Sequence, residues 1–290
     1  MQYYVLYNPL AGNGTAEEKV HALHDKIHHD LIKCDMTKID SYEDFFSKIN
    51  SDDIVILCGG DGTLNRFINE TDHLDIPCDF WYFPAGTGND FLSDLGKTAE
   101  EAPFSIKKYL YNLPHVTVNG KTYRFINNMS FGIDGYCCEI GDKKKAESTK
   151  KVDYTAIAIT GMLYDYKPTN ATVIVDGVEH HFKKVWLCPT MKGRYCGGGM
   201  NISPKQDRLN PDGELSVMIF YGGGRLRTLI AFPSIFKGEH VKHKKMVKIL
   251  TGKDIVVKFD SPRSAQVDGE TILNVTEYHA YAKEPAKVEA

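Results

Sequence analysis

The sequence predicts a two-domain protein, in which an α/β domain with a parallel sheet is followed by an antiparallel β-sandwich domain. The chain has 290 residues, which is more than one small domain needs. In its first half, short apolar runs alternate with segments of helical spacing, as in sheets whose parallel strands are joined by helices. In its second half, Asn119-Gly120 and Asp176-Gly177 each separate two strand-like runs and favour tight hairpins.

The elements of the first domain follow from the spacing of apolar residues. Tyr3–Tyr7 is a short apolar strand, and Thr15-Ala-Glu-Glu18 opens a helix whose apolar spacing continues to Leu31. A near-continuous apolar strand at 53–57 indicates a sheet that is buried on both faces. Thr63 can cap the helix that comes after it. The further expected elements are a strand around Lys38, a helix near Tyr42–Asn50 and a strand at Phe80–Phe83.

The second domain consists mainly of strand-like runs. Two helical stretches, Tyr154–Leu163 and Arg225–Phe236, interrupt them. We assign residues 1–120 to the first domain and residues 121–277 to the second, and we allow residues 278–290 to join the first. The expected strands flank the two hairpin turns and continue at Lys184–Leu187, Glu214–Tyr221, Asp254–Phe259 and Thr271–Asn274.

Charge and cysteine usage exclude several classes of protein. The net charge is −3 and the pI is near 6.4, so we expect no nucleic-acid partner. The seven cysteines form no CxxC pair, which argues against a disulfide framework or a zinc site and for a reducing cytoplasm. The residues MQYYVLYNP do not resemble a signal peptide, and no apolar run approaches the roughly 20 residues that span a bilayer. We therefore expect a cytoplasmic protein that rests at most on the inner face of the membrane.

Three glycine-rich turns follow strands in the first domain. They read NPLAGNGT, GGDGT and PAGTGND, and each precedes a helix. Loops at the carboxyl ends of parallel strands form the ligand crevice of an open α/β sheet. Glycines there let backbone N–H groups approach phosphate oxygens, with a helix N-terminus behind them. An ordinary tight turn explains any one of these segments, but three in one domain favour a nucleotide polyphosphate.

Asp61 places a carboxylate inside the second of these turns. A carboxylate repels phosphate unless a cation lies between them. Asp61 therefore suits either a Mg²⁺ ion that bridges phosphate oxygens or the orientation of an attacking hydroxyl. The alternative is that Asp61 is a local turn former.

These motifs together resemble the diacylglycerol kinase catalytic family, which includes soluble bacterial lipid kinases and sphingosine kinases. The second half adds NNMSFGIDG, NPDGELSV and QVDGE in the family's order, so the resemblance covers nearly the whole chain. It implies an NAD-kinase-like α/β domain, a β-sandwich domain and an active site in the cleft between them. It also implies an enzyme that uses ATP and Mg²⁺ to phosphorylate a lipid hydroxyl, with diacylglycerol as the first expectation and phosphatidic acid as its product.

The resemblance assigns residues to the chemistry and to the nucleotide. Glu270 would be the proton acceptor, with Asp268 beside it in the same motif. Asp61 would engage Mg²⁺ or the acceptor hydroxyl and is the rival base. A hairpin turn is the alternative explanation of the Asp268 motif. The expected nucleotide-binding residues are Asn8, Pro9, Gly12, Thr37, Gly59, Gly60, Asp61, Gly62, Thr63, Asn65, Thr87, Asn89 and Asp90.

A second, structural Mg²⁺ is expected in the NPDGE segment. The resemblance implies that the Asp212 carboxylate and the carbonyls of Leu209 and Glu214 hold it, and hard cations take oxygen ligands of this kind. The alternative is a proline-initiated turn. Such a site would brace the sandwich and take no part in the chemistry.

A lipid acceptor implies a protein that works at a membrane surface. The lysines at 143–145 and at 237–245 could contact anionic lipid at roughly 1 kcal/mol per residue, although charge runs are more often solvated surface. The segment LRTLIAFPSIFKGEH adds apolar and aromatic residues beside the second cluster. The strands at the edges of the sandwich could also pair with those of a second copy and form a homodimer. An NAD kinase and a non-catalytic nucleotide-binding regulator at the membrane are the competing functions.

Overall fold

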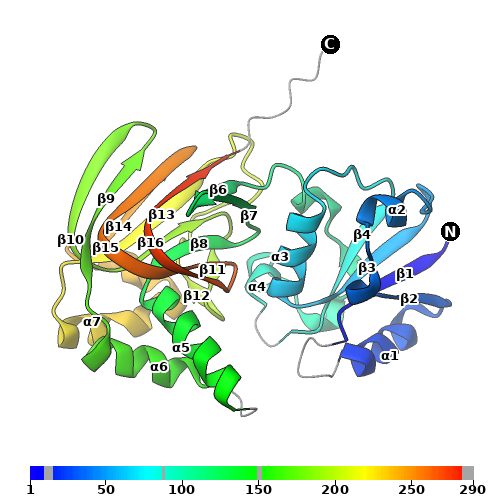
Figure 1. The fold of residues 1–290 in the computed structure, drawn as a ribbon, viewed down its shortest axis with the longest axis horizontal. Coiled ribbons are helices and arrows are strands. Elements are labelled where there is room, and N and C mark those ends of the chain that lie inside the picture. The colour runs from blue at the N-terminus through cyan, green and yellow to red at the C-terminus, as the bar shows by residue number, and fades with distance from the viewer. Residues whose placement is uncertain (10–15, 87–88, 149–151, 283–290) are drawn as a thin grey trace. The chain divides into compact units, whose positions relative to one another are not determined.

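The computed structural model of the chain describes residues 1–9, 16–86, 89–148 and 152–282. The chain divides into two compact units, Met1–Tyr111 and Asn112–Ala290, whose elements are drawn in Figure 1. The boundary between the units, after Tyr111, comes earlier in the sequence than the expected boundary at residue 120. The reason is that the strands at 115–118 and 121–124 belong to the sheet of the second unit.

The first unit contains an open sheet of five strands. Its strands are β1 (Tyr3–Tyr7), β2 (Leu31–Asp35), β3 (Ile54–Gly59), β4 (Asp79–Pro84) and the short β5 (Phe104–Ser105). The first four are parallel and β5 is antiparallel to β4. The order is β2-β1-β3-β4-β5, so the winding of the chain reverses between β1 and β3. The helices between the strands are α1 (Ala16–Ile27), α2 (Tyr42–Phe46), α3 (Asp61–Glu70) and α4 (Asp90–Asp94), with 3₁₀ turns at Met36–Lys38, Ala99–Glu101 and Lys107–Tyr109.

Apolar packing on both faces of the sheet explains the sequence of β3. Val55, Ile56 and Leu57 are fully buried, as expected of a central parallel strand. The inner face of α3 covers the sheet, and its Phe67 ring stacks on Phe80 with 4.6 Å between ring centroids. The predicted α/β layout of this unit is therefore confirmed.

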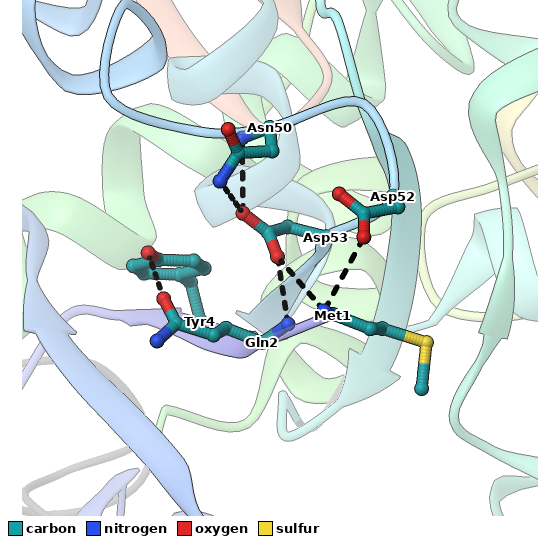
Figure 2. A network of polar contacts seen from close by, with 6 residues as sticks. All are labelled: Met1, Gln2, Tyr4, Asn50, Asp52 and Asp53. Atoms are coloured by element: carbon teal, nitrogen blue, oxygen red, sulfur yellow. Dashed lines mark hydrogen bonds and ion pairs between the residues drawn. The ribbon is translucent and has the colours of Figure 1, made fainter.

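Asp53 fixes the start of β3 beside the start of β1 (Figure 2). Its carboxylate is 1% exposed. One oxygen accepts the backbone N–H of Gln2 at 2.7 Å, and the other accepts the backbone and side-chain N–H groups of Asn50 at 2.9 and 3.1 Å. The backbone N–H of Asn50 is the largest of the causes that hold the pKa of the Asp53 carboxyl below its ordinary value. This network aligns two strands whose opposite ends carry the candidate site.

Three local expectations for the first unit are wrong. The helix α1 ends at Ile27 because His28 takes a left-handed φ of 55°, so Leu31 begins β2 instead of continuing the helix. Lys38 ends a 3₁₀ turn after β2 and does not lie in a strand. Thr63 lies inside α3 because this helix begins directly after Gly60.

The second unit is a β-sandwich built on an antiparallel sheet of nine strands. Its long strands β10 and β15 each pair with β9 through one half and with β8 through the other. Register shifts within both strands bend them, which lets one continuous sheet form two layers. The strands are β6 (His115–Val118), β7 (Lys121–Arg124), β8 (Asn128–Gly132), β9 (Thr169–Val175), β10 (Val178–Met191), β13 (Leu215–Tyr221), β14 (Val247–Gly252), β15 (Asp254–Val267) and β16 (Glu270–Tyr281), with β11 (Tyr195–Cys196) and β12 (Met200–Asn201) in a separate pair.

Helical segments gather at one end of the second unit (Figure 1). They bury one cluster of apolar residues, which includes Trp186 and Met218, and a second cluster around Phe131 fills the sandwich. The segments are α5 (Ile133–Glu147), α6 (Tyr154–Thr160), η5 (Gly161–Asp165), α7 (Arg225–Ala231), η6 (Phe232–Lys237) and η7 (Glu239–Lys242). Among the described residues, none of the helices has the length and apolar character that a membrane span requires.

Two features of the second unit differ from expectation. The sequence pattern does not predict α5, because its apolar residues soon give way to the charged run at 142–145. Residues 278–281 were expected to be able to join the first domain. They pair instead with β6 and β15, inside the second unit. Residues 283–290 lie outside the described part of the chain.

Candidate functional site

The predicted nucleotide loops lie side by side at one edge of the first unit's sheet. Tyr7 of β1 is opposite Cys58 of β3, and Gly59 is opposite Pro84 of β4. The segments that follow these strands therefore emerge next to one another, at the point where the winding reverses. Of the expected nucleotide-binding residues, Gly12 and Thr87 lie outside the described residues. The others lie at the ends of the parallel strands or in the segments that follow them, and they are Asn8, Pro9, Thr37, Gly59, Gly60, Asp61, Gly62, Thr63, Asn65, Asn89 and Asp90.

Gly59 lets a helix begin directly at the end of β3. A Cβ atom on this residue would lie 2.4 Å from the Cβ of Thr63, so only glycine allows α3 to pack so close to the strand. Gly60 precedes the helix, and its position offers no side chain to cap the first turn. The first backbone N–H groups of α3, from Asp61, Gly62 and Thr63, have no acceptor within the helix, which suits them to an anionic ligand.

Asp61 joins two of the loops. One carboxylate oxygen accepts the backbone N–H of Asp90 at 2.7 Å, and the other is 3.4 Å from the backbone N of Phe91. Asp61 therefore caps the first turn of α4 from another loop. These bonds connect the GGDGT turn to the start of α4, a connection that the sequence does not predict.

Polar side chains surround this connection. Asn65 is 7% exposed, and its oxygens accept the side-chain amide of Asn69. Asn89 directs its amide nitrogen to the carbonyl of Gly86 at 3.3 Å, while its buried Oδ1 has no hydrogen-bond partner in the described structure. Thr37 is exposed, and its hydroxyl donates to Asp35 at 2.7 Å. Asn89 thus offers a buried oxygen, whereas Thr37 stabilises a local turn.

Asp268 is a structural residue of the second unit. Asp268 and Gly269 have φ values of 46° and 96° and form a two-residue hairpin turn between β15 and β16. The Asp268 carboxylate is buried and accepts three backbone N–H groups, those of residues 126, 127 and 128, at 2.7–2.9 Å. These bonds give Asp268 a role in holding this turn, and the catalytic role expected from the sequence stays a prediction.

Glu270 is the exposed residue that this turn presents. It is the first residue of β16, opposite Val267. Within the described residues, the structure shows no hydrogen bond or ion pair of its carboxylate. The turn before it is held from a second side, because Gln266 accepts the backbone N–H of Gly269 at 2.7 Å and donates to Asp134 at 3.3 Å. Burial raises the pKa of the Asp134 carboxyl.

In the NPDGE segment, side-chain amides already engage Glu214, one of the residues expected to hold a structural Mg²⁺. The carbonyl of Glu214 accepts the side-chain amides of Gln206 and Asn210, both at 2.9 Å. These N–H groups occupy the positions where a cation would bind this oxygen. Leu209 and Asp212 are exposed. Over the described ranges, no group of three or more His, Cys, Asp or Glu side chains could hold a metal ion. The hydrogen bond from the backbone N–H of Gly213 to the carbonyl of Asn210 at 3.2 Å fits the alternative explanation, a proline-initiated turn, and the Mg²⁺ site stays a prediction.

Two buried basic residues of the second unit are not predicted from the sequence. Lys192 directly follows β10 and is 5% exposed, and Arg208 is 7% exposed. Burial and the nearby Arg208 lower the pKa of the Lys192 ammonium to about 8. The sequence gives one signal for Lys192, its place directly after an apolar run, but a lysine in such a place is usually exposed.

Comparison with known proteins covers both units. A family model described as the diacylglycerol kinase catalytic domain matches residues 2–112, and one described as the YegS C-terminal NAD kinase beta sandwich-like domain matches residues 127–286. A Mycobacterium tuberculosis protein named diacylglycerol kinase is 26% identical over 251 residues, which cover 82% of this chain and 79% of that protein.

Solved structures from Bacillus anthracis share the fold. The crystal structure of a diacylglycerol kinase matches with a TM-score of 0.59 and 20% identity over 97% of this chain and 94% of that chain. Another solved chain from this organism gives a TM-score of 0.66 at 21% identity, over 98% of this chain and 92% of that chain. These likenesses confirm the predicted fold class, an α/β domain followed by a β-sandwich domain.

Proposed function

The chain belongs to the diacylglycerol kinase catalytic-domain family, whose members are phosphotransferases that act on an alcohol acceptor, and we propose that it uses ATP and Mg²⁺ to phosphorylate diacylglycerol. The product would be phosphatidic acid. The observation that carries the nucleotide part of this proposal is the bond between Asp61 and Asp90, which unites two glycine-rich loops at the carboxyl edge of the sheet. This is where an open α/β sheet binds its ligand.

The first turn of α3 would bind phosphate oxygens of ATP. Its N–H groups have no acceptor within the helix and lie at the positive end of the helix dipole. The buried Oδ1 of Asn89 is an oxygen of the kind that Mg²⁺ or a nucleotide donor group takes. Mg²⁺ would enter with ATP and neutralise charge on its phosphates. Asp61 contributes by holding the two loops together.

Glu270 would be the general base. It is exposed at the start of β16, on a turn fixed by Asp268 and Gln266. In the proposed step, the lipid hydroxyl oxygen bonds to the γ-phosphorus of ATP and the bond from this phosphorus to the β,γ-bridging oxygen breaks. The hydroxyl proton passes to the Glu270 carboxylate. Asp61 is less suited to this task because backbone N–H groups already engage its carboxylate.

An apolar surface on the helices of the second unit supports a lipid substrate. We define it by Tyr164, Leu226 and Ile230, which are 72%, 68% and 73% exposed. Arg225 connects the segments that carry them, because its guanidinium on α7 donates to the carbonyl of Met162 in η5 at 2.9 Å. Arg227, which lies between Leu226 and Ile230 in the sequence, is also exposed. Apolar side chains beside a cation suit contact with an anionic membrane.

A labelling experiment tests the function. Purified protein is incubated with Mg²⁺ and γ-labelled ATP, with diacylglycerol vesicles in one tube and NAD in another. We expect label in the lipid only. Label in NAD would show an NAD kinase. ATP binding without transfer to either acceptor would indicate a non-catalytic regulator, and both results would contradict the proposal.

A further inference from the structure

The helix α5 binds the residue that follows Glu270. Thr271 comes directly after Glu270 in β16, and its hydroxyl donates to Oδ2 of Asp142 at 2.6 Å. Asp142 belongs to α5, and its other carboxylate oxygen pairs with the ammonium of Lys145 on the same helix at 3.3 Å. The two carboxylate oxygens therefore have separate partners, and the one that faces β16 is bonded to Thr271.

The same helix also binds the residue that precedes Glu270. The backbone N–H of Gly269 donates to Oε1 of Gln266 at 2.7 Å. The amide nitrogen of Gln266 donates in turn to Oδ2 of Asp134, in the first turn of α5, at 3.3 Å. Gln266 and Asp134 are both buried, so water does not compete strongly for these bonds. Glu270 thus lies between two residues that are bonded to α5, one directly and the other through Gln266.

The spacing of residues along α5 explains how one helix reaches this hairpin. Gly135, Glu139 and Asp142 follow one another at intervals of four and three residues, so they share one face of the helix. A Cβ atom on Gly135 would lie 2.2 Å from the carbonyl oxygen of Ser264 in β15, so only glycine allows the helix to pack so close to the strand. The hydroxyl of Ser264 also donates to Glu139. The face of α5 that carries Asp142 is therefore packed on the hairpin strands.

We propose that Asp142 and Thr271 are positioning residues for Glu270. A general base acts only within hydrogen-bond reach of the proton that it accepts. The end of a hairpin moves more than the strands behind it because fewer contacts hold it, and Glu270 is exposed at this end. The bond between Asp142 and Thr271 ties the start of β16 to a packed helix. The role of Glu270 as a base rests on the proposed function, whereas the bond does not depend on it.

Two substitutions of Thr271 separate this role from general support of the strand. Valine has the shape of threonine without the hydroxyl, and serine keeps the hydroxyl without the methyl group. Valine favours β-strands more than serine does, so a side chain that only supported the strand would tolerate valine better. Positioning predicts the reverse order. Thr271→Val should lower kcat about 3- to 10-fold at unchanged KM for ATP, as for the loss of one hydrogen bond, and Thr271→Ser should match the wild type.

Variants of Asp142 test the bond from its other side. Asp142→Asn keeps an oxygen that accepts the Thr271 hydroxyl, so it should keep kcat, whereas Asp142→Ala should lower kcat as Thr271→Val does. The double variant Asp142→Ala/Thr271→Val should lose no more than either single variant, because both substitutions remove the same bond. In the Glu270→Gln background, Thr271→Val should have no further effect. The matched control is Thr117→Val, which removes an exposed hydroxyl bond to Thr122 in the hairpin of β6 and β7.

Hydrogen exchange of the full chain tests the bond without turnover. Thr271→Val should raise the rate of amide exchange in peptides that span the turn between β15 and β16 by about 3- to 10-fold. Thr271→Ser and Thr117→Val should exchange there at the wild-type rate. Asp142→Ala repeats the measurement at an exposed position of α5, where the substitution leaves the sequence of the strand unchanged.

Three results would overturn the proposal. These are unchanged exchange at this turn in both Thr271→Val and Asp142→Ala, a wild-type kcat in an active Thr271→Val enzyme, and an equal loss of kcat in Thr271→Ser and Thr271→Val. Failure of the proposed function looks different, because the wild type would then transfer no label to diacylglycerol. Faster exchange in Thr271→Val would still confirm that Asp142 and Thr271 hold Glu270 in place in such a protein.

Discussion

The carboxylate of Asp61 accepts the backbone N–H of Asp90 at 2.7 Å, across 29 residues of sequence. The two residues belong to loops that follow neighbouring parallel strands, β3 and β4. A single side chain thus sets the distance between two glycine-rich segments and caps α4. The proposed ATP site depends on this bond, because its polar groups come from both loops.

Replacement of Asp61 by alanine should therefore loosen the site and lower stability together. The loss of a capping carboxylate typically reduces the free energy of unfolding by about 0.5–2 kcal/mol. Asp61→Ala should show a loss of this size in urea unfolding and weaker ATP binding by calorimetry. Asp75→Ala, at an exposed position of the same unit, is the control and should match the wild type in both measurements. An Asp61→Ala protein with unchanged ATP affinity would show that the connection between the loops does not support the nucleotide site.

Glu270→Gln should separate chemistry from binding. A general base typically contributes about 10²–10⁴-fold to the rate, so kcat for lipid phosphorylation should fall by that factor. ATP affinity and Tm should stay unchanged, since the side chain is exposed. Glu277→Gln is the matched control on the same strand, where the carboxylate forms an exposed ion pair with Lys258 at 3.1 Å. A Glu270→Gln protein that keeps wild-type kcat would exclude Glu270 as the base.

Asp268→Asn should lower the free energy of unfolding and, as a consequence, the activity. The amide keeps the shape of the carboxylate, but its NH₂ group would face backbone N–H groups that now donate to an oxygen. An unsatisfied buried donor typically reduces the free energy of unfolding by about 1–3 kcal/mol. We expect this loss in urea unfolding, together with a lower kcat because Glu270 follows the same turn. A variant with wild-type stability and no activity would instead restore the direct catalytic role that the sequence suggested.

The Lys192 ammonium should give stability a distinct pH dependence. Its pKa in the folded protein is about 8, against an ordinary value of 10.5. Between these values the unfolded chain binds a proton that the folded protein does not, so the free energy of unfolding should increase as pH rises from about 8 to about 10.5. The full increase is on the order of 3 kcal/mol. Arg208 and Asp207 are the charged groups that act on Lys192.

Urea unfolding at pH 7.5, 8.5 and 9.5 checks this dependence. The quantity to compare is the difference between the wild type and Lys192→Met, because cysteines and tyrosines also titrate in this range. That difference should favour the variant at pH 7.5 and shrink as pH rises. A constant difference would show that Lys192 does not titrate there.

The spacing of residue types along the chain predicts much of the fold, because strands, helices and tight turns depend mainly on neighbouring residues. The apolar run at 53–57 predicts a strand that is buried on both faces, and Asp176-Gly177 predicts a tight turn between two strands. The structure confirms both predictions. The helix α5 was missed because its pattern is mostly charged after the first turn. The role of Asp268 depends on backbone groups about 140 residues away in sequence. Sequence motifs identify such residues, but only tertiary contacts distinguish a structural carboxylate from a reactive one.

The apolar surface on the helices of the second unit should mediate membrane binding. Leu226 and Ile230 are one turn apart on α7 and are mostly exposed, so both can insert into a bilayer. The double variant Leu226→Ser/Ile230→Ser should bind vesicles of phosphatidylglycerol and diacylglycerol about 10- to 100-fold more weakly in a sedimentation assay. Leu273→Ser, at a 51% exposed position on β16, controls for the general loss of an apolar side chain. Binding should also weaken at high salt because Arg227 contributes charge. Equal vesicle binding by the double variant and the wild type would show that lipid contact occurs elsewhere on the molecule.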